Sequence, residues 1–322
     1  MMFRCFLWVS FLMFSFNISA QLETTKIIVG NGPEDLVVDT FLGSERLIVA
    51  CSARRNSELP FNEIMSIDLK TNEITKMHRV QPSSICFHPH GLDLVFAKND
   101  KTLFIVNHCN EKDIHQILQY SIVGDSLFFI SATNHNLIVS PNAVCGFADG
   151  SFIVSNDAGK HGAIFEKLFI QKKSKLVFCN VDSCVEIGER VCFGNGVTMT
   201  DSFLYHASTM PGAVYKYERN GNSFSNRVLL SKVKGADNIR LYGEYIIVAG
   251  HPKFGKFISH MKNAKKHSPS EVWIINRFTG ESTIVFRSDG SLISAASGAV
   301  IYKNYLFIAQ VFDNFVLKVR LD

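Results

Sequence analysis

The feature that most constrains the fold of this chain is a strand-pair pattern that recurs six times from residue 34 to the C-terminus. In each copy a polar or small residue leads into a run of aliphatic residues, and a second apolar run follows about ten residues later. The copies begin at Glu34, His90, Asn142, Asn195, Asn238 and Gly298, with spacings of 56, 52, 53, 43 and 60 residues. Each unit is long enough for a four-stranded sheet, and such sheets bury both faces only by packing against their neighbours. The repeat therefore predicts an all-β protein, a six-bladed β-propeller, in preference to a pair of β-sandwiches with coincidental hairpins.

The repeat also predicts which distant residues meet. If equivalent residues open the innermost strand of every blade, they form a ring around one mouth of the central channel. The expected ring consists of Glu34, His90, Asn142, Asn195, Asp237-Asn238 and Ser297-Gly298. A single Asn or Asp before a strand is commonly a turn residue that bonds its own backbone. Five polar members at equivalent places in a repeat favour a shared ligand instead.

The chemistry of this ring points to a hard cation. Carboxylate and amide oxygens are the ligands that Ca²⁺ takes, six to eight at a time and in flexible geometry, whereas Mg²⁺ demands a tighter octahedron. A zinc site at His88-Pro89-His90 is the local alternative, but no third histidine or cysteine follows at a suitable spacing. We expect Ca²⁺ in the ring, where it would polarise a carbonyl oxygen as a Lewis acid.

Histidines near the ring are candidates for a general base, because the pKa of histidine lies near neutral pH. His90 belongs to the ring itself. His108 ends the second strand of the same blade, and His251 ends the matching strand of the fifth blade. We expect His88 to lie in the turn that leads to His90. For each of these side chains a surface or core role is the alternative.

Composition narrows the class of protein further. The chain has 322 residues, of which 47% are hydrophobic and 19% are charged, as in folded globular proteins. The net charge is 33 − 29 = +4, without the clustered basic excess that is usual in nucleic-acid binders. We therefore expect no nucleic-acid partner.

The first twenty residues stand apart from the repeat. One arginine, Arg4, precedes the apolar run Phe6–Phe16, and the small residue Ala20 follows, which is the pattern of a secretory signal peptide. The run is too short for a transmembrane helix, which needs about 20 apolar residues. We expect residues 1–20 to be a cleaved signal, residues 21–322 to be the propeller, and the protein to be secreted or periplasmic. An uncleaved N-terminal membrane anchor is the alternative.

Cysteines and the one basic segment give weaker signals. Seven cysteines follow the signal segment, so at least one lacks an intramolecular partner. Cys179 and Cys184 are close enough in the chain for a local disulfide, and no CxxC pair indicates structural zinc. The best helix candidate, residues 255–266, lies in the basic stretch 251–267. This stretch is a solvated face, or a lid that touches a membrane or an acidic partner. The GxSxG, HExxH and GxxxxGK[ST] motifs do not occur.

A series of short segments resembles the paraoxonase/arylesterase family of calcium-dependent, six-bladed propeller lactonases. The matching segments include "GPEDLVV", "HPHGLDL", "FIVNH", "FGNGV", "GADNI", "AGHP", "SPSEVWII" and "VIYKNYLFIAQVF". They follow one another in the family's order from about residue 30 to the C-terminus. Each motif is short, and the specificity lies in the ordered set.

The resemblance implies roles for individual residues. It implies a catalytic Ca²⁺ at Glu34, Asn142, Asn195, Asp237 and Asn238, with His90 and His108 as a dyad in which His90 is the base. It implies a second, buried Ca²⁺ held by Asp35, the backbone carbonyl of Leu92 and an Asp directly after Asn142. It implies pocket walls at Phe193, His251, Val311 and Phe312.

Two features depart from the family pattern. Residue 143 is Ala rather than Asp, so the second Ca²⁺ site has lost a carboxylate. Vertebrate members join their chain ends by a disulfide, but this chain has no cysteine after Cys192. We therefore expect strand pairing alone to hold the last strand.

The resemblance implies a hydrolase that opens lactones and cleaves aryl esters, with a small-molecule substrate and Ca²⁺ as cofactor. Membrane association is not indicated, and the sequence leaves the oligomeric state open. Two alternatives stand beside it. One is a propeller enzyme of the gluconolactonase or strictosidine-synthase type, and the other is a non-catalytic propeller that serves as a binding module or chaperone.

Overall fold

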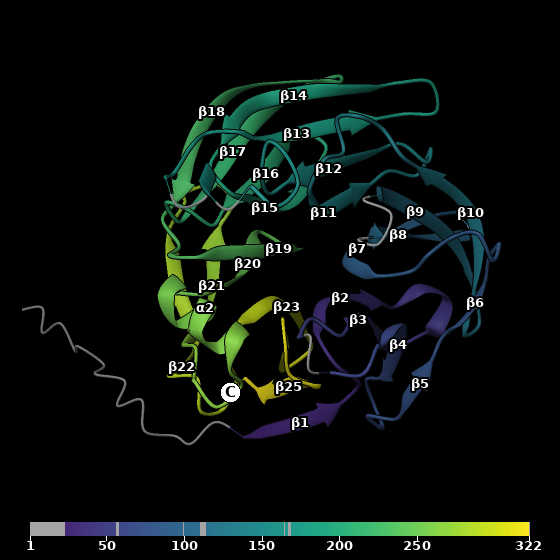
Figure 1. Cartoon of the computed structure of the whole chain (residues 1–322), viewed down its shortest axis with the longest axis vertical. Helices are drawn as coiled ribbons and strands as arrows, with labels where there is room; N and C mark the ends of the chain where they lie inside the picture. The colour runs from purple at the N-terminus through teal and green to yellow at the C-terminus, as the bar shows by residue number, and fades with distance from the viewer. Residues whose placement is uncertain are drawn as a thin grey trace, which may run out of the picture.

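The computed structural model describes residues 23–55, 58–98, 100–109, 114–163, 165–166 and 169–321. The expected signal peptide, residues 1–20, lies outside this part of the chain. Within it, six antiparallel sheets surround a central channel, each running outward from an innermost strand (Figure 1). The structure thus confirms the six-bladed β-propeller.

The first three blades follow the predicted repeat. Blade 1 contains β2 (Pro33–Asp39), β3 (Arg46–Ser52), β4 (Asn62–Asp68) and β5 (Ile74–Lys76), with a short 3₁₀ turn η1 (Phe41–Gly43). Blade 2 contains β7 (Pro89–Ala97), β8 (Asp100–Cys109), β9 (Ile114–Val123) and β10 (Ser126–Thr133), with β6 (His78–Val80) parallel to β10 at its outer edge. Blade 3 contains β11 (Pro141–Gly146), β12 (Phe152–Asn156), β13 (Ser174–Cys179) and β14 (Cys184–Val191).

The second half repeats the arrangement. Blade 4 contains β15 (Gly194–Met199), β16 (Phe203–Ser208), β17 (Ala213–Asn220) and β18 (Ser223–Ser231). Blade 5 contains β19 (Ala236–Tyr242), β20 (Tyr245–Gly250), β21 (Ser270–Asn276) and β22 (Ser282–Ser288). Blade 6 contains β23 (Ala296–Tyr302), β24 (Tyr305–Gln310), β25 (Phe315–Arg320) and, from the other end of the chain, β1 (Thr24–Ile28).

The ring of blades is closed by pairing of the chain ends. β1 runs antiparallel to β25, with Thr24 opposite Val319 and Ile28 opposite Phe315 (Figure 1). The pairing of β1 with β25 closes the ring of blades, as the sequence predicts from the absence of a cysteine near the end of the chain. The outermost strand of blade 6 thus comes from the N-terminal end of the described chain.

The apolar core lies between neighbouring blades rather than within one. One cluster joins Ile48 and Ile64 of blade 1 to Leu103 and Leu118 of blade 2, and similar clusters join each other pair of neighbours. Full burial of such a side chain contributes about 1.5–3 kcal/mol. Each blade therefore depends on both of its neighbours, and the sheets hold the inner strands in fixed positions.

Two disulfides tie strands within blades. Cys179 pairs with Cys184 across the β13–β14 turn, a local disulfide that their spacing in the sequence allows. Cys86 pairs with Cys109 and fastens the loop before β7 to the end of β8, a link that the sequence did not indicate. Burial raises the pKa of the thiols of Cys51 and Cys145, so both act as small apolar side chains.

Helix α2 (Phe254–Lys262) is shorter than the predicted helix 255–266. It follows β20 and lies on the same side of the blades as the ring residues (Figure 1). Lys256 and Lys262 are exposed. No helix in the described ranges is long and apolar enough to cross a membrane.

Candidate active site

A cavity of about 490 Å³ opens at one mouth of the channel. Ten of the thirteen predicted site residues line it: Glu34, His90, His108, Asn142, Phe193, Asn195, Asp237, His251, Val311 and Phe312. The other three, Asn238, Asp35 and Leu92, are buried beneath it. His88, which we expected in the turn before β7, lies in that loop and also lines the cavity.

The ring residues reach the cavity because every inner strand begins with a bulge. In β2 the ladder register shifts between Pro33 and Asp35, and in β11 it shifts between Pro141 and Ala143. The four other inner strands shift at the same place. A bulge leaves its extra residue outside the ladder and redirects that side chain. The second residue of each strand is therefore free to face the channel mouth.

The second strand of each blade holds the loop that leads into the ring. In blade 2, Asn107 accepts a hydrogen bond from the backbone N–H of His88 at 2.7 Å and donates one to the carbonyl of Cys86 at 3.0 Å. In blade 3, Asn156 accepts from the N–H groups of Val139 and Ser140, both at 2.9 Å. These bonds fix the approach to His90 and Asn142.

Two buried carboxylates face the cavity, and both have cationic or imidazole partners. Asp237 Oδ2 lies 2.6 Å from His251 Nε2. Burial raises the pKa of Asp237, and the His251 contact opposes that rise. Glu34 contacts the Arg54 guanidinium and lies 2.9 Å from His90 Nε2. Burial alone would raise the pKa of Glu34, but Arg54 and His90 together hold it below the usual range, so this carboxylate is ionised.

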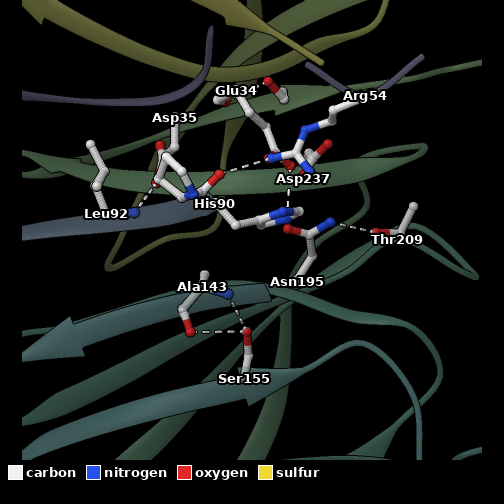
Figure 2. A network of polar contacts seen from close by, with 12 residues as sticks. Glu34, Asp35, Arg54, His90, Leu92, Ala143, Ser155, Asn195, Thr209 and Asp237 are labelled. Atoms are coloured by element: carbon white, nitrogen blue, oxygen red, sulfur yellow. Dashed lines mark hydrogen bonds and ion pairs between the residues drawn. The ribbon is translucent and has the colours of Figure 1, made fainter. Parts of the chain in front are cut away.

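The amides of the ring offer oxygens with no other use. Asn142 Oδ1, Asn195 Oδ1 and Asn238 Oδ1 are buried and have no hydrogen-bond partner among the described residues. Asn195 is oriented by its Nδ2, which donates to Thr209 Oγ1 at 3.2 Å; Thr209 in turn donates to the carbonyl of Ala236 (Figure 2). An unsatisfied buried acceptor costs about 1–3 kcal/mol. Three such oxygens in the same ring as two carboxylates fit a hard cation.

The fit depends on amide oxygens. The described residues contain no group of three or more His, Cys, Asp or Glu side chains arranged to hold a metal. The ring has only two carboxylates, Glu34 and Asp237, and its remaining donors are amides. Such a set suits Ca²⁺, whose usual ligands are carboxylate and carbonyl oxygens, better than zinc or another metal that prefers nitrogen and sulfur.

A row of four histidines extends from the ring through blade 2 to the loop between β12 and β13 of blade 3. The ring centroids of His90 and His108 are 4.9 Å apart, and His108 Nδ1 lies 2.9 Å from His115 Nδ1. His115 in turn packs on His161 at 4.3 Å between centroids. Burial and the neighbouring His90 and His115 hold the pKa of His108 well below its usual value, so His108 is neutral at neutral pH. A neutral His108 can hold a hydrogen bond to His115 through Nδ1, but its low pKa opposes the uptake of a proton.

Sequence reasoning missed several residues of the cavity. His115 faces His108 across the β8–β9 ladder, and the alternating pattern of that hairpin was the signal that could have found it. Arg54 and Arg55 line the cavity from the loop after β3, and no repeat position marks them. From α2, the cavity receives the side chains of Phe254, Phe257 and Met261.

Helix α2 is therefore a wall of the cavity rather than a solvated face. Phe257 lies 4.4 Å from His251 and 5.5 Å from Phe312 between ring centroids. Phe254 packs edge-to-face on Phe193 at 6.0 Å. These contacts join the predicted wall residues into one aromatic surface. The lysines of the basic segment, such as Lys256 and Lys262, remain exposed on the other side of the helix.

The positions implied for a second, buried Ca²⁺ are already occupied by a side chain. The guanidinium of Arg240 bonds Asp35 and the Leu92 carbonyl, and Ala143 offers no carboxylate. The residues present do not fit a metal ion there, in line with the carboxylate that is missing at residue 143.

The fold and the site together define the class: a six-bladed β-propeller with an oxygen-rich, aromatic-walled cavity at the mouth of its channel. A family model described as Arylesterase matches residues 57–317. The chain belongs to the arylesterase family.

Relatives with curated names support the same assignment. Serum paraoxonase/arylesterase 1 of Mus musculus is 24% identical over 240 residues, which cover 70% of this chain and 66% of that protein. Serum paraoxonase/arylesterase 2 of Homo sapiens is 24% identical over 240 residues, with coverage of 70% and 67%. The matched region thus spans about two thirds of the length of these relatives.

Solved structures share the fold at low identity. A gluconolactonase from Xanthomonas campestris superposes with a TM-score of 0.62 and 10% identity, covering 94% of this chain and 90% of that one. A putative gluconolactonase gives a TM-score of 0.58 with 13% identity, covering 94% and 92%. At this identity the likeness concerns the propeller alone.

Proposed function

We propose that this protein is a Ca²⁺-dependent hydrolase that opens lactones and cleaves aryl esters. The observation that carries the proposal is the set of three unpartnered amide oxygens, on Asn142, Asn195 and Asn238, in one ring with two buried carboxylates. Membership of the arylesterase family supports an ester as the bond that is cleaved.

The proposed cation site consists of Glu34, Asn142, Asn195, Asp237 and Asn238. When bound, Ca²⁺ supplies Lewis-acid polarisation of the ester carbonyl and offsets the negative charge that develops on its oxygen. Glu34 and Asp237 bring the opposing charge, and Thr209 holds the Asn195 amide in orientation.

The proposed proton transfers belong to His90, which His108 supports. His90 takes a proton from a water molecule, whose oxygen forms a bond to the acyl carbon of the substrate. The bond between that carbon and the alkoxy oxygen then breaks, and the proton returns to the leaving oxygen, so that a lactone yields one hydroxy acid. His108, kept neutral by burial, supports His90 through an edge-on ring contact, and His115 orients His108 through the Nδ1 contact.

The proposed substrate pocket is aromatic. The apolar part of the cavity lining consists of four phenylalanines and one valine: Phe193, Phe254, Phe257, Phe312 and Val311. An aryl group or the alkyl chain of a lactone therefore has an apolar surface to contact. Arg54 and Arg55 lie at the same mouth, where Arg54 pairs with Glu34 and Arg55 pairs with Glu58 and Asp313.

The test measures hydrolysis of a panel of lactones and aryl esters with Ca²⁺ and with excess chelator. We expect activity in Ca²⁺ that chelator abolishes, and a loss of about 10²-fold or more in Asn195→Ala and Glu34→Gln. Asn304→Ala, an exposed asparagine in the β23–β24 turn, is the matched control. Full activity in chelator would refute the proposal.

A non-catalytic propeller is the second candidate, and one contact favours it. The Arg54 guanidinium already neutralises Glu34, which weakens the attraction of the ring for a cation. If this candidate is correct, no substrate of the panel is hydrolysed and Ca²⁺ does not bind at the ring.

For localisation we propose secretion directed by residues 1–20, with an N-terminal anchor as the alternative. Expression of the full chain followed by N-terminal sequencing of the mature protein distinguishes them. Cleavage near residue 20 supports secretion, and retention of Met1 in the membrane fraction supports the anchor.

A further inference from the structure

Arg240 crosses the channel and joins three blades beneath the active-site cavity. It belongs to β19 of blade 5, and its Nη2 donates to Asp35 Oδ2 of blade 1 at 2.6 Å and to the Leu92 carbonyl of blade 2 at 2.9 Å. Its Nε donates to the carbonyl of Leu36 at 3.3 Å. The side chain is only 12% exposed, and that of Asp35 is 1% exposed. Arg240 therefore forms a buried ion pair at the centre of the propeller.

Asp35 is bonded on every side. Its Oδ1 accepts from the N–H of Leu36 at 2.9 Å, and its Oδ2 accepts from the N–H of Leu92 at 2.8 Å (Figure 2). A Cβ on Gly298 would lie 3.1 Å from Asp35 Oδ1, so blade 6 also closes on this carboxylate. With Arg240, Asp35 accepts three hydrogen bonds from three groups, and its negative charge is already paired with a guanidinium.

The third position of the pocket is apolar. Ala143 is buried in the cluster between blades 3 and 4, and its backbone bonds Ser155 of the neighbouring strand (Figure 2). A divalent ion at this place would meet one carboxylate and one carbonyl, both already bonded to a guanidinium of like charge. Burying a second positive charge there is unfavourable, because neither charge could be fully paired.

Arg240 also acts on a second, half-buried carboxylate. Asp93 of blade 2 accepts a hydrogen bond from the N–H of Gly146 at 2.8 Å. Burial raises the pKa of Asp93, and the positive charge of Arg240 opposes that rise. One guanidinium thus offsets negative charge contributed by two residues of different blades, as a bound cation would.

We infer that Arg240 is a built-in cation that replaces a structural metal ion at the centre of this propeller. In this inference Arg240 supplies the positive charge that a metal ion would supply, and a carboxylate at residue 143, which would help to hold such an ion, is absent. The propeller is then held together at its centre without a divalent ion, and the only Ca²⁺ site is the proposed one at the cavity mouth. This inference does not depend on catalytic activity.

The first experiment counts ions and measures stability. Ca²⁺ binding to the wild-type protein is followed by calorimetry, and thermal unfolding is recorded in Ca²⁺ and in excess chelator. We expect one Ca²⁺ per chain. In Asn195→Ala, which disrupts the mouth site, we expect no Ca²⁺ binding and the same melting temperature in both buffers. Two bound ions in the wild type, or chelator-sensitive unfolding of Asn195→Ala, would overturn the inference.

The second experiment exchanges the cation. Arg240→Leu leaves Asp35 buried without its partner, so we expect a large fall in melting temperature that Ca²⁺ does not reverse. In Ala143→Asp/Arg240→Leu, which restores two carboxylates, we expect one more bound Ca²⁺ than in the wild type and a melting temperature that rises with Ca²⁺. Arg227→Leu is the control, because Arg227 pairs with the exposed Glu189 at the blade periphery. Equal melting temperatures of Arg240→Leu and Arg227→Leu would contradict the inference.

The outcomes separate this inference from the proposed function. A wild-type protein that binds no Ca²⁺ at all, yet unfolds at a temperature that depends on Arg240, refutes the Ca²⁺-dependent hydrolase and supports the built-in cation. If Arg240→Leu does not fold, the ion count and the behaviour of Asn195→Ala still decide the question.

Discussion

The buried imidazole of His206 makes the stability of the protein sensitive to acid. His206 lies on β16 of blade 4, is fully buried, and has no hydrogen-bond partner for either ring nitrogen among the described residues. Burial, with a smaller contribution from the charge of Arg227, lowers its pKa from 6.5 to about 3. The folded protein therefore keeps this imidazole neutral over a pH range in which the unfolded chain protonates it.

The sign and size of the effect follow from linkage. Because the folded-state pKa is depressed, the contribution of His206 to stability is complete above pH 6.5 and is lost as the pH falls toward about 3. At pH 5 the unfolded state, with its pKa near 6.5, gains about 2 kcal/mol from protonation, and the folded state gains almost nothing. Between pH 8 and pH 5, His206 should therefore cost the fold about 2 kcal/mol.

The assay is urea unfolding at pH 8 and pH 5, at constant Ca²⁺, for the wild type and His206→Leu. The change between the two pH values is compared, so any packing effect of leucine cancels. We expect the wild type to lose about 2 kcal/mol more than the variant. His78→Leu, which replaces an exposed histidine of β6, should behave as the wild type does. An identical pH response of wild type and His206→Leu would refute the reasoning.

Other predictions test the site and the blades. His115→Gln should lower kcat by about tenfold or more, leave KM unchanged and shift the pH–rate profile, since His115 orients His108; a change in KM alone would contradict this role. Arg54→Met should tighten Ca²⁺ binding by about tenfold, as measured by calorimetry. The substitution removes the positive guanidinium that pairs with Glu34 and that would repel the positive ion. Replacing Cys86 and Cys109 by serine should reduce the free energy of unfolding, measured in urea, by about 2–4 kcal/mol. Their disulfide joins residues that are 23 positions apart in the sequence and so restricts the unfolded chain.

The sequence by itself determined the propeller and the positions of its ring. A strand pair repeated six times admits few folds, because each sheet needs neighbours on both faces. Glu34, Asn142 and Asn195 open equivalent strands, so their convergence at one channel mouth follows from the approximate symmetry of the repeat. The bulge that turns each side chain inward is a feature of the folded sheet. In the sequence, only the Pro or Gly that precedes each of these three residues is a weak sign of it.

Only the tertiary structure decided what surrounds that ring. Arg54 and Arg240 occupy positions that the repeat does not mark. The side chain of Arg240, in blade 5, reaches partners in blades 1 and 2. His115 contacts His108 because the register of the β8–β9 hairpin places them opposite each other. Helix α2 lies against the cavity because Phe257 packs on Phe312. Periodicity fixes where a backbone runs, but which charge neutralises a buried carboxylate depends on contacts between residues distant in sequence. For that reason the family resemblance could imply, and Ala143 could put in doubt, a metal beside Asp35, whereas only the structure shows that an arginine pairs with it.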